Sequence, residues 1–181
     1  MSDVVRLTLV SHAMTDAMSA GRFPADEPVN ALGLRQAGAV TDLGAADVAL
    51  CGPERRTRQT AEALGLDATP DPLLADLDVG GWRGVALDEI DPGELAAWVT
   101  DTDTAPHGAE SVAALLARVG RFMRSATVTP RRIVAVTHPA VIRAAILTAL
   151  DAPPKAFWRI DIAPLSRTTL HHRGPGWTLR N

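Results

Sequence analysis

The chain has 181 residues, of which 46% are hydrophobic and 22% charged, and its formal net charge is −3. This length and composition predict one globular domain over residues 1–181, and the slightly acidic balance without a basic stripe argues against a nucleic-acid partner. The single cysteine, Cys51, allows no internal disulfide. No apolar run is long enough to cross a membrane. Met1–Arg6 lacks the apolar core of a signal peptide, so a cytoplasmic protein is the default expectation.

The first predicted element is the apolar run Leu7–Val10, which ends in Ser11 and His12. A run of this kind is typical of a strand buried on both faces, and such strands form parallel sheets with helices on each side. The expected fold is therefore α/β, a three-layer α/β/α sandwich around a mainly parallel sheet. Ligands bind beyond the carboxyl ends of the strands in such sheets, which is where His12 lies. Taken alone, His12 has the ordinary alternative of a hydrogen-bonded histidine at a strand end.

Residues 13–30 form a polar loop that follows this strand and can cover the site. Arg22 and Phe23 are its candidate functional residues, although both also fit the description of solvated loop residues. Asn30 is a good N-cap for the next helix. A strand is expected over Asp47–Leu50.

A helix is predicted after Pro53, with Arg56 in its first turn. Helix N-termini favour anions, and a guanidinium matches phosphate oxygens. Residues 66–107, rich in Pro, Gly and Asp, form the expected excursion that acts as a lid and selects the substrate. It contains Asp76, Trp82 and Trp98, with short helical pieces near Asp88–Ile90 and Glu94–Val99.

The second half of the chain repeats the opening pattern. The apolar run Ile133–Val136 ends in Thr137 and His138, so two strand ends can bring two imidazoles together at one sheet edge. The remaining predicted elements are an amphipathic helix over Glu110–Met123, a buried helix over Ala140–Leu150, and edge strands over Trp158–Ile162 and Thr168–His171.

Several motifs in order along the chain resemble the histidine phosphatase superfamily, also called phosphoglycerate-mutase-like. They are Val10-Ser11-His12-Ala13, Asn30–Ala37, Arg56-Thr57-Arg58-Gln59-Thr60-Ala61, Leu74–Gly84, Pro106–Ser111 and Thr137–Ala144. The family has arginine where this chain has Ser11, and glutamate is commoner where it has Asp76.

The resemblance implies that His12 attacks phosphorus and forms a phosphohistidine. Arg56 and His138 would bind the equatorial oxygens, and Asp76 would protonate the leaving alcohol and then activate water. The substrate-binding residues expected beside them are Ser11, Arg22, Arg83 and Thr137. Serine supplies no charge in place of the family's arginine, and losing one charged transition-state donor commonly costs about a hundredfold to a thousandfold in rate. Arg83 or Arg22 is the candidate to fill that gap.

The expected activity is that of a metal-independent, acid-type phosphatase acting on a small phosphorylated molecule. No Cys/His cluster has metal-ligand spacing and no cofactor motif is present, so neither a metal nor a cofactor is expected. Two alternatives stay open: a phosphoglycerate-type mutase, for which the chain is short, and a non-catalytic binder of phosphorylated ligands. A homodimer is open as well.

Overall fold

The computed structural model describes residues 4–129 and 131–180, and its centre is a six-stranded sheet in the order β3-β2-β4-β1-β5-β6. The strands are β1 (Val5–Ser11), β2 (Val48–Cys51), β3 (Thr69–Pro70), β4 (Arg132–Thr137), β5 (Arg167–Arg173) and β6 (Gly176–Arg180). β1, β2, β3 and β4 run parallel, whereas β5 is antiparallel to both β1 and β6. The sheet is therefore mainly parallel, as the sequence predicts.

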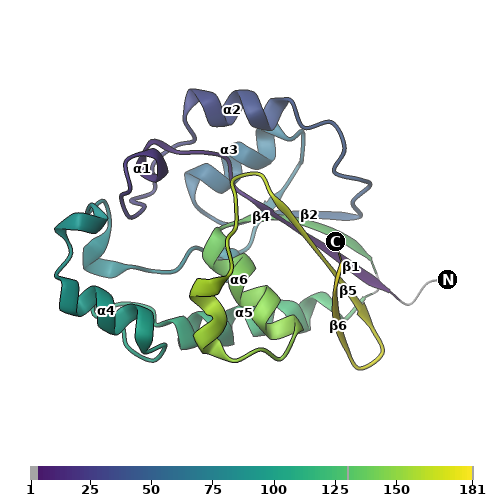
Figure 1. Ribbon diagram of the computed structural model, residues 1–181. Coiled ribbons are helices and arrows are strands. Elements are labelled where there is room, and N and C mark those ends of the chain that lie inside the picture. The colour runs from purple at the N-terminus through teal and green to yellow at the C-terminus, as the bar shows by residue number, and fades with distance from the viewer. Residues whose placement is uncertain (1–3, 130, 181) are drawn as a thin grey trace.

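Helices cover both faces of the sheet. The α-helices of the described residues are α1 (Asp16–Ser19), α2 (Ala31–Gly38), α3 (Arg55–Ala63), α4 (Pro92–Thr100), α5 (Val112–Ala126) and α6 (Pro139–Ala149), and α1 and α4 lie away from the sheet (Figure 1). α2 and α3 lie on one side of the sheet, and α5 and α6 lie on the other (Figure 1). Leu7 and Leu9 belong to the larger core under α5 and α6, while Val10 belongs to the smaller core under α3. This alternation along β1 explains why successive residues of Leu7–Val10 are buried on both faces of the sheet, and it confirms the three-layer architecture.

The helix starts follow from short-range chemistry. Asn30 accepts a hydrogen bond from the Gly33 amide at the start of α2, and Ser111 does the same for the Ala114 amide at the start of α5. α5 buries the apolar stripe that predicted it, including Leu115. The two helical pieces expected in the excursion are also present, as the turn Leu87–Glu89 and as α4.

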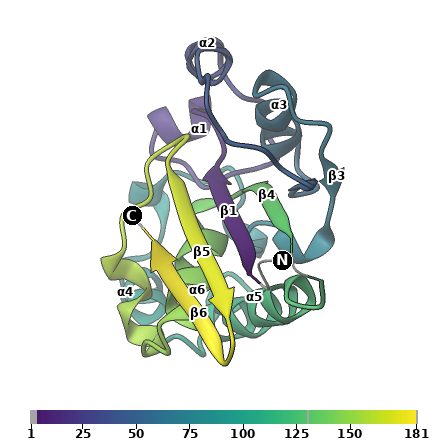
Figure 2. The same cartoon turned by 90° about the vertical axis from the view of Figure 1, so that its right-hand side faces the viewer.

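The carboxyl-terminal part differs from the prediction. The prediction of a strand over Trp158–Ile162 is wrong. Pro154–Arg159 instead forms a 3-10 helix, here called η4, in which Phe157 is buried. Prolines 153 and 154 favour the start of a helix, and they have no N–H group to donate to a neighbouring strand. β5 contains the other expected strand, and β6, which the sequence reasoning missed, pairs with it as a hairpin (Figure 2).

Among residues 4–129 and 131–180, no helix is long and apolar enough to cross a membrane. Met1–Asp3, on which the expectation about the amino-terminal segment partly rests, lie outside the described residues.

Candidate active site

The register of the sheet brings the two histidines together. Ser11 of β1 pairs with Thr137 of β4, so both strands end at the same level and each is followed by its histidine. The His12 amide donates to the Thr137 carbonyl at 2.9 Å, and the two imidazole centroids lie 5.2 Å apart. The predicted meeting of the imidazoles at one sheet edge is confirmed.

His12 is almost completely buried and is held by its own loop. Its Nδ1 lies 2.8 Å from the Ala13 carbonyl, to which it donates, so Nε2 keeps its lone pair. The Ala13 amide in turn donates to Thr60 Oγ1 on α3. Burial lowers the pKa of His12 to about 4, and the charges of His138 and Arg56 act in the same direction against the Ala13 carbonyl and Asp76. His12 is therefore a neutral imidazole at neutral pH.

Arg56 projects from the first turn of α3 and is only 2% exposed. Its Nη2 lies 2.5 Å from Asp76 Oδ2, in an ion pair. Its Nε and Nη1 have no partner among the described residues. Buried donors are rarely left without an acceptor, so the N–H groups on these two nitrogens are available for the oxygens of a bound anion.

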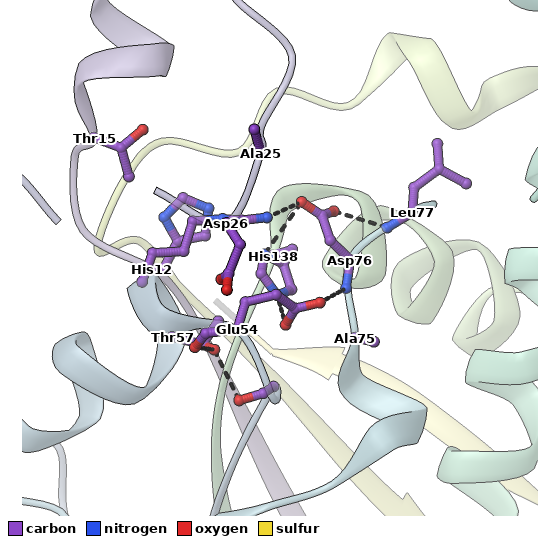
Figure 3. A network of polar contacts seen from close by, with 12 residues as sticks. His12, Thr15, Ala25, Asp26, Glu54, Thr57, Ala75, Asp76, Leu77 and His138 are labelled. Carbon is purple, nitrogen blue, oxygen red and sulfur yellow. Dashed lines mark hydrogen bonds and ion pairs between the residues drawn. The ribbon is translucent and has the colours of Figure 1, made fainter. Parts of the chain in front are cut away.

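Asp76 reaches the site from the excursion. Its Oδ1 accepts from the Leu77 amide at 2.8 Å, and its Oδ2, besides contacting Arg56, lies 3.3 Å from His138 Nδ1 (Figure 3). Burial raises the pKa of Asp76, but the interactions with His138 and with the Arg56 guanidinium outweigh burial and lower it. The carboxylate is therefore ionised, and it contacts the two groups, Arg56 and His138, that the family resemblance assigns to phosphoryl oxygens.

His138 is fully buried and is fixed from its other side by Glu54. Its Nε2 lies 2.7 Å from Glu54 Oε2, while Glu54 Oε1 accepts from the Asp76 amide at 2.9 Å (Figure 3). Burial raises the pKa of Glu54, but the hydrogen bond and charge of His138 lower it overall. A Cβ at Gly52 would lie 2.9 Å from His138 Nε2 and from Glu54 Oε2, so the turn after β2 needs glycine for this close approach.

Two further residues that hold this site were missed by the sequence reasoning. Glu54 lies directly before the helix that carries Arg56, and a carboxylate beyond a strand end was the available signal. Arg118, on α5, donates to the carbonyls of Leu73, Ala75 and Asp76 and pairs with Glu110 at 2.7 Å. It fixes the segment that carries Asp76, but nothing in its own helical pattern indicated that role.

A cavity of about 180 Å³ opens beside His12, Arg56 and Asp76. Most of its wall is apolar or aromatic, and charged side chains interrupt it at a few places. The wall includes Met18, Arg22, Phe23, Glu27, Leu77, Val79, Trp98, Arg143, Phe157 and Trp158. Trp82 is not part of the lining; it is buried and packs against Phe23 and Trp98.

The four expected substrate-binding residues differ in their position relative to the cavity. Arg22 lines the cavity, although its Nη1 also donates to the Gly84 carbonyl. Arg83 pairs with Asp78 at 2.8 Å and lines a neighbouring hollow that shares the Arg56–Asp76 pair but not His12. Ser11 and Thr137 are fully buried and are absent from the cavity lining.

The polar atoms of these two buried residues have different surroundings. Thr137 Oγ1 donates to the Leu74 carbonyl at 2.8 Å, which ties β4 to the segment before Asp76. Ser11 Oγ has no partner among the described residues. Ser11 therefore adds no donor to the cavity as it stands.

Comparison with known proteins agrees with this geometry. The model of the histidine phosphatase superfamily (branch 1) matches residues 7–181, and the chain belongs to this family. It is 33% identical over 175 residues to the glucosyl-3-phosphoglycerate phosphatase of Mycobacterium tuberculosis, which covers 84% of this chain and 78% of that protein.

Two further likenesses extend this finding. The solved structure of mycobacterial glucosyl-3-phosphoglycerate phosphatase with VO3 superposes with a TM-score of 0.83 at 27% identity, covering 97% of each chain. The chain is 30% identical over 178 residues to the bifunctional protein Rv2228c of Mycobacterium tuberculosis, covering 89% of this chain and 49% of that protein. The chain thus spans about half the length of that relative.

Proposed function

We infer that this protein is a phosphomonoesterase that hydrolyses a small phosphorylated substrate through a phosphohistidine at His12. The observation that carries the inference is the convergence of His12, Arg56, Asp76 and His138 at one sheet edge. The phosphatase names of its relatives support the reaction class.

The buried, neutral His12 suits nucleophilic attack. Its Nδ1–H is held by the Ala13 carbonyl, which leaves the Nε2 lone pair to form the bond to phosphorus while the ester P–O bond breaks. The unpartnered N–H groups of Arg56 and the imidazole of His138 bind the oxygens on which charge develops. Water then attacks the phosphohistidine, the N–P bond breaks, and inorganic phosphate leaves.

Asp76 is the group that moves the proton in this scheme. It gives a proton to the leaving alkoxide in the first step and accepts one from water in the second. Its low pKa in the unliganded site means that the proton arrives with the substrate, since phosphate monoesters keep one proton below about pH 6. Phosphoryl charge beside the carboxylate raises its pKa and favours that transfer.

The same residues support metal-independent, acid-type catalysis. Because the pKa of His12 is about 4, the nucleophile stays neutral in mildly acidic solution, where the substrate monoanion predominates. Arg56 supplies the fixed positive charge that a metal would otherwise provide.

The test is direct detection of the intermediate. The protein is mixed with an aryl phosphate in the presence of a chelator, denatured within milliseconds, and assayed for acid-labile, base-stable phosphate on His12. We expect a labelled protein, and no label and a turnover lower by about a thousandfold or more in His12→Ala. Unchanged turnover in His12→Ala contradicts the proposal, and loss of activity in the chelator contradicts metal independence.

A non-catalytic binder of phosphorylated ligands is the second candidate. The observation in its favour is that Ser11, which stands in place of the family's arginine, does not line the cavity. Tight binding of inorganic phosphate, together with no turnover and no trapped phosphohistidine on any ester, would establish the binder instead.

A further inference from the structure

Arg143 is a charged side chain of the cavity that the proposed reaction does not use. It lies on α6, the helix that begins directly after His138. Its Nε donates to the Ile160 carbonyl at 2.7 Å. Its guanidinium carbon lies 5.7 Å from the ring centre of Phe157 and 5.9 Å from that of Trp158. These contacts come from η4 and the residue after it, in the yellow-green segment beside α6 in Figure 1, and they fix the guanidinium in one place.

The remaining donors of Arg143 are unengaged. Among residues 4–129 and 131–180, Nη1 and Nη2 donate to no protein acceptor, and the side chain lines the same cavity as His12 and Arg56. Burial lowers the pKa of Arg143, against the nearby charges of Asp161 and Asp76, but an arginine stays protonated in proteins. The cavity therefore contains a fixed cation whose paired N–H groups have no protein partner.

Each of the other two arginines of the cavity forms an ion pair with a carboxylate. Arg56 is bonded to Asp76, and Arg22 lies 3.6 Å from Glu89. The carboxylate of Asp76 contacts Arg56 and His138, and Arg143 is not among its ion-pair partners in the described chain. Arg143 therefore does not share the carboxylate that Arg56 and His138 contact.

Apolar side chains, among them Leu77, Val79 and Ala140, line the same cavity. We propose that Arg143 is a specificity-determining residue that binds a carboxylate on the alcohol part of the substrate, while the phosphoryl group binds at His12 and Arg56. This rests on the proposed phosphatase function. The substrate class is a phosphomonoester of a small hydroxy acid with an otherwise weakly polar body, because two parallel N–H groups match a carboxylate.

A competing role for Arg143 is to replace the arginine missing at Ser11 and to hold the phosphoryl group itself. The two roles differ in what they recognise. A phosphoryl clamp acts on every ester, whereas a carboxylate site acts only on esters that carry a carboxylate. Two esters of matched shape, 3-phosphoglycerate and glycerol 3-phosphate, differ in that one group and separate the two roles.

The experiment measures kcat and KM for both esters in wild type, Arg143→Gln, Arg143→Lys and Arg121→Gln. We expect wild type to prefer the carboxylate ester. Arg143→Gln should reduce this preference by about tenfold to a hundredfold, mainly through KM, because a hydrogen bond to a charged group contributes that much. Arg143→Lys should retain part of it. Arg121, which is exposed on α5 outside the cavity, is the control for loss of one positive charge.

Equal losses on both esters in Arg143→Gln, or no preference in wild type, would overturn the proposal. The thermal unfolding midpoints of the variants identify a folding defect in Arg143→Gln. In that case the ester preference of Arg143→Lys, which keeps the positive charge, distinguishes the two roles. If neither ester is turned over, the proposed function fails on these substrates, and calorimetric Kd values of the same two esters still test Arg143 alone. Indistinguishable Kd values for the two esters would reject it.

Discussion

The two halves of the candidate site are built in different ways. The reacting half consists of His12, Arg56 and His138, which follow strand ends and are bonded to the backbone or to carboxylates. The wall half consists of side chains from the 13–30 loop, the excursion, η4 and the first turns of α6, and its aromatic side chains pack on one another. The ring centres of Trp98 and Trp158 are 4.3 Å apart, and those of Phe23 and Trp98 are 5.6 Å apart.

Under the proposed function, this difference assigns the reaction to one half and the choice of substrate to the other. A one-residue shift of β1 against β4 would move His12 away from His138, so the reacting half depends on the hydrogen-bond ladder of the sheet. The wall half depends on the side chains of several segments outside the sheet, and those can change without disturbing the ladder. We therefore expect substitutions in the reacting half to lower turnover on every ester, and substitutions in the wall to change which ester is preferred.

After His12→Ala, the largest effect should come from Arg56→Gln, which removes the fixed charge of the reacting half. We expect kcat to fall by about a hundredfold to a thousandfold on all esters. The Asp76 carboxylate would also lose its 2.5 Å partner, so the free energy of unfolding should fall by about 3 kcal/mol. Steady-state kinetics and urea unfolding measure the two effects. Arg58→Gln, on an exposed position of the same helix, is the matched control, and equal losses in both variants would place the effect in the helix rather than in the site.

Asp76→Asn should change catalysis and binding in opposite directions. The amide cannot transfer the proton, so turnover of an alkyl phosphate should fall by about a hundredfold or more. The negative charge that contacts Arg56 and His138 is removed at the same time, so inorganic phosphate should bind more tightly, by about tenfold. Calorimetry with phosphate checks the second effect. Weaker phosphate binding in the variant would show that Asp76 does not compete with the ligand for these two groups.

The reacting half could be predicted because its positions follow from local patterns. The apolar runs before His12 and His138 identify the strand ends, and a parallel sheet places such ends at one edge. The Pro53 that precedes α3 likewise identifies a helix start, and Arg56 lies in the first turn of that helix, where anions are favoured. The sequence did not identify Glu54 or Arg118, because their roles depend on where His138 and the Asp76 segment come to lie after folding.

The wall half could not be predicted from periodicity. Trp158–Ile162 alternates like a strand, yet prolines 153 and 154 start a 3-10 helix that places Phe157 in the core and Trp158 against the cavity. Arg143 lies within a motif of the family resemblance, but only the position of η4 shows that its guanidinium is fixed beside the site.

The pH dependence of stability should report the burial of His12. Its pKa is about 4 when folded and 6.5 as the ordinary value, so the unfolded chain binds the extra proton between these pH values. Stability from this group is present above pH 6.5 and is lost as the pH falls to about 4, by about 3 kcal/mol in all. Urea unfolding of wild type and His12→Ala across this range measures the difference. Parallel pH profiles would show that the imidazole is not desolvated in the folded protein.

The smallest effects should come from the exposed arginines. Arg83 is bonded to Asp78 with both side chains about half exposed, and such pairs contribute less than about 1 kcal/mol. Arg83→Ala should therefore change kcat/KM by less than about fivefold on any ester. Arg22 lines the cavity, so Arg22→Ala should raise KM somewhat more while leaving kcat similar.

If either arginine replaces the charge missing at Ser11, its removal should instead lower kcat severely on every ester, and Ser11→Arg should rescue that variant, because groups that serve the same oxygen are not additive. If both substitutions have small effects, Arg56 is the principal guanidinium of the reacting half. Ser11 then marks a position where the site binds the phosphoryl group with one guanidinium fewer than the family pattern has.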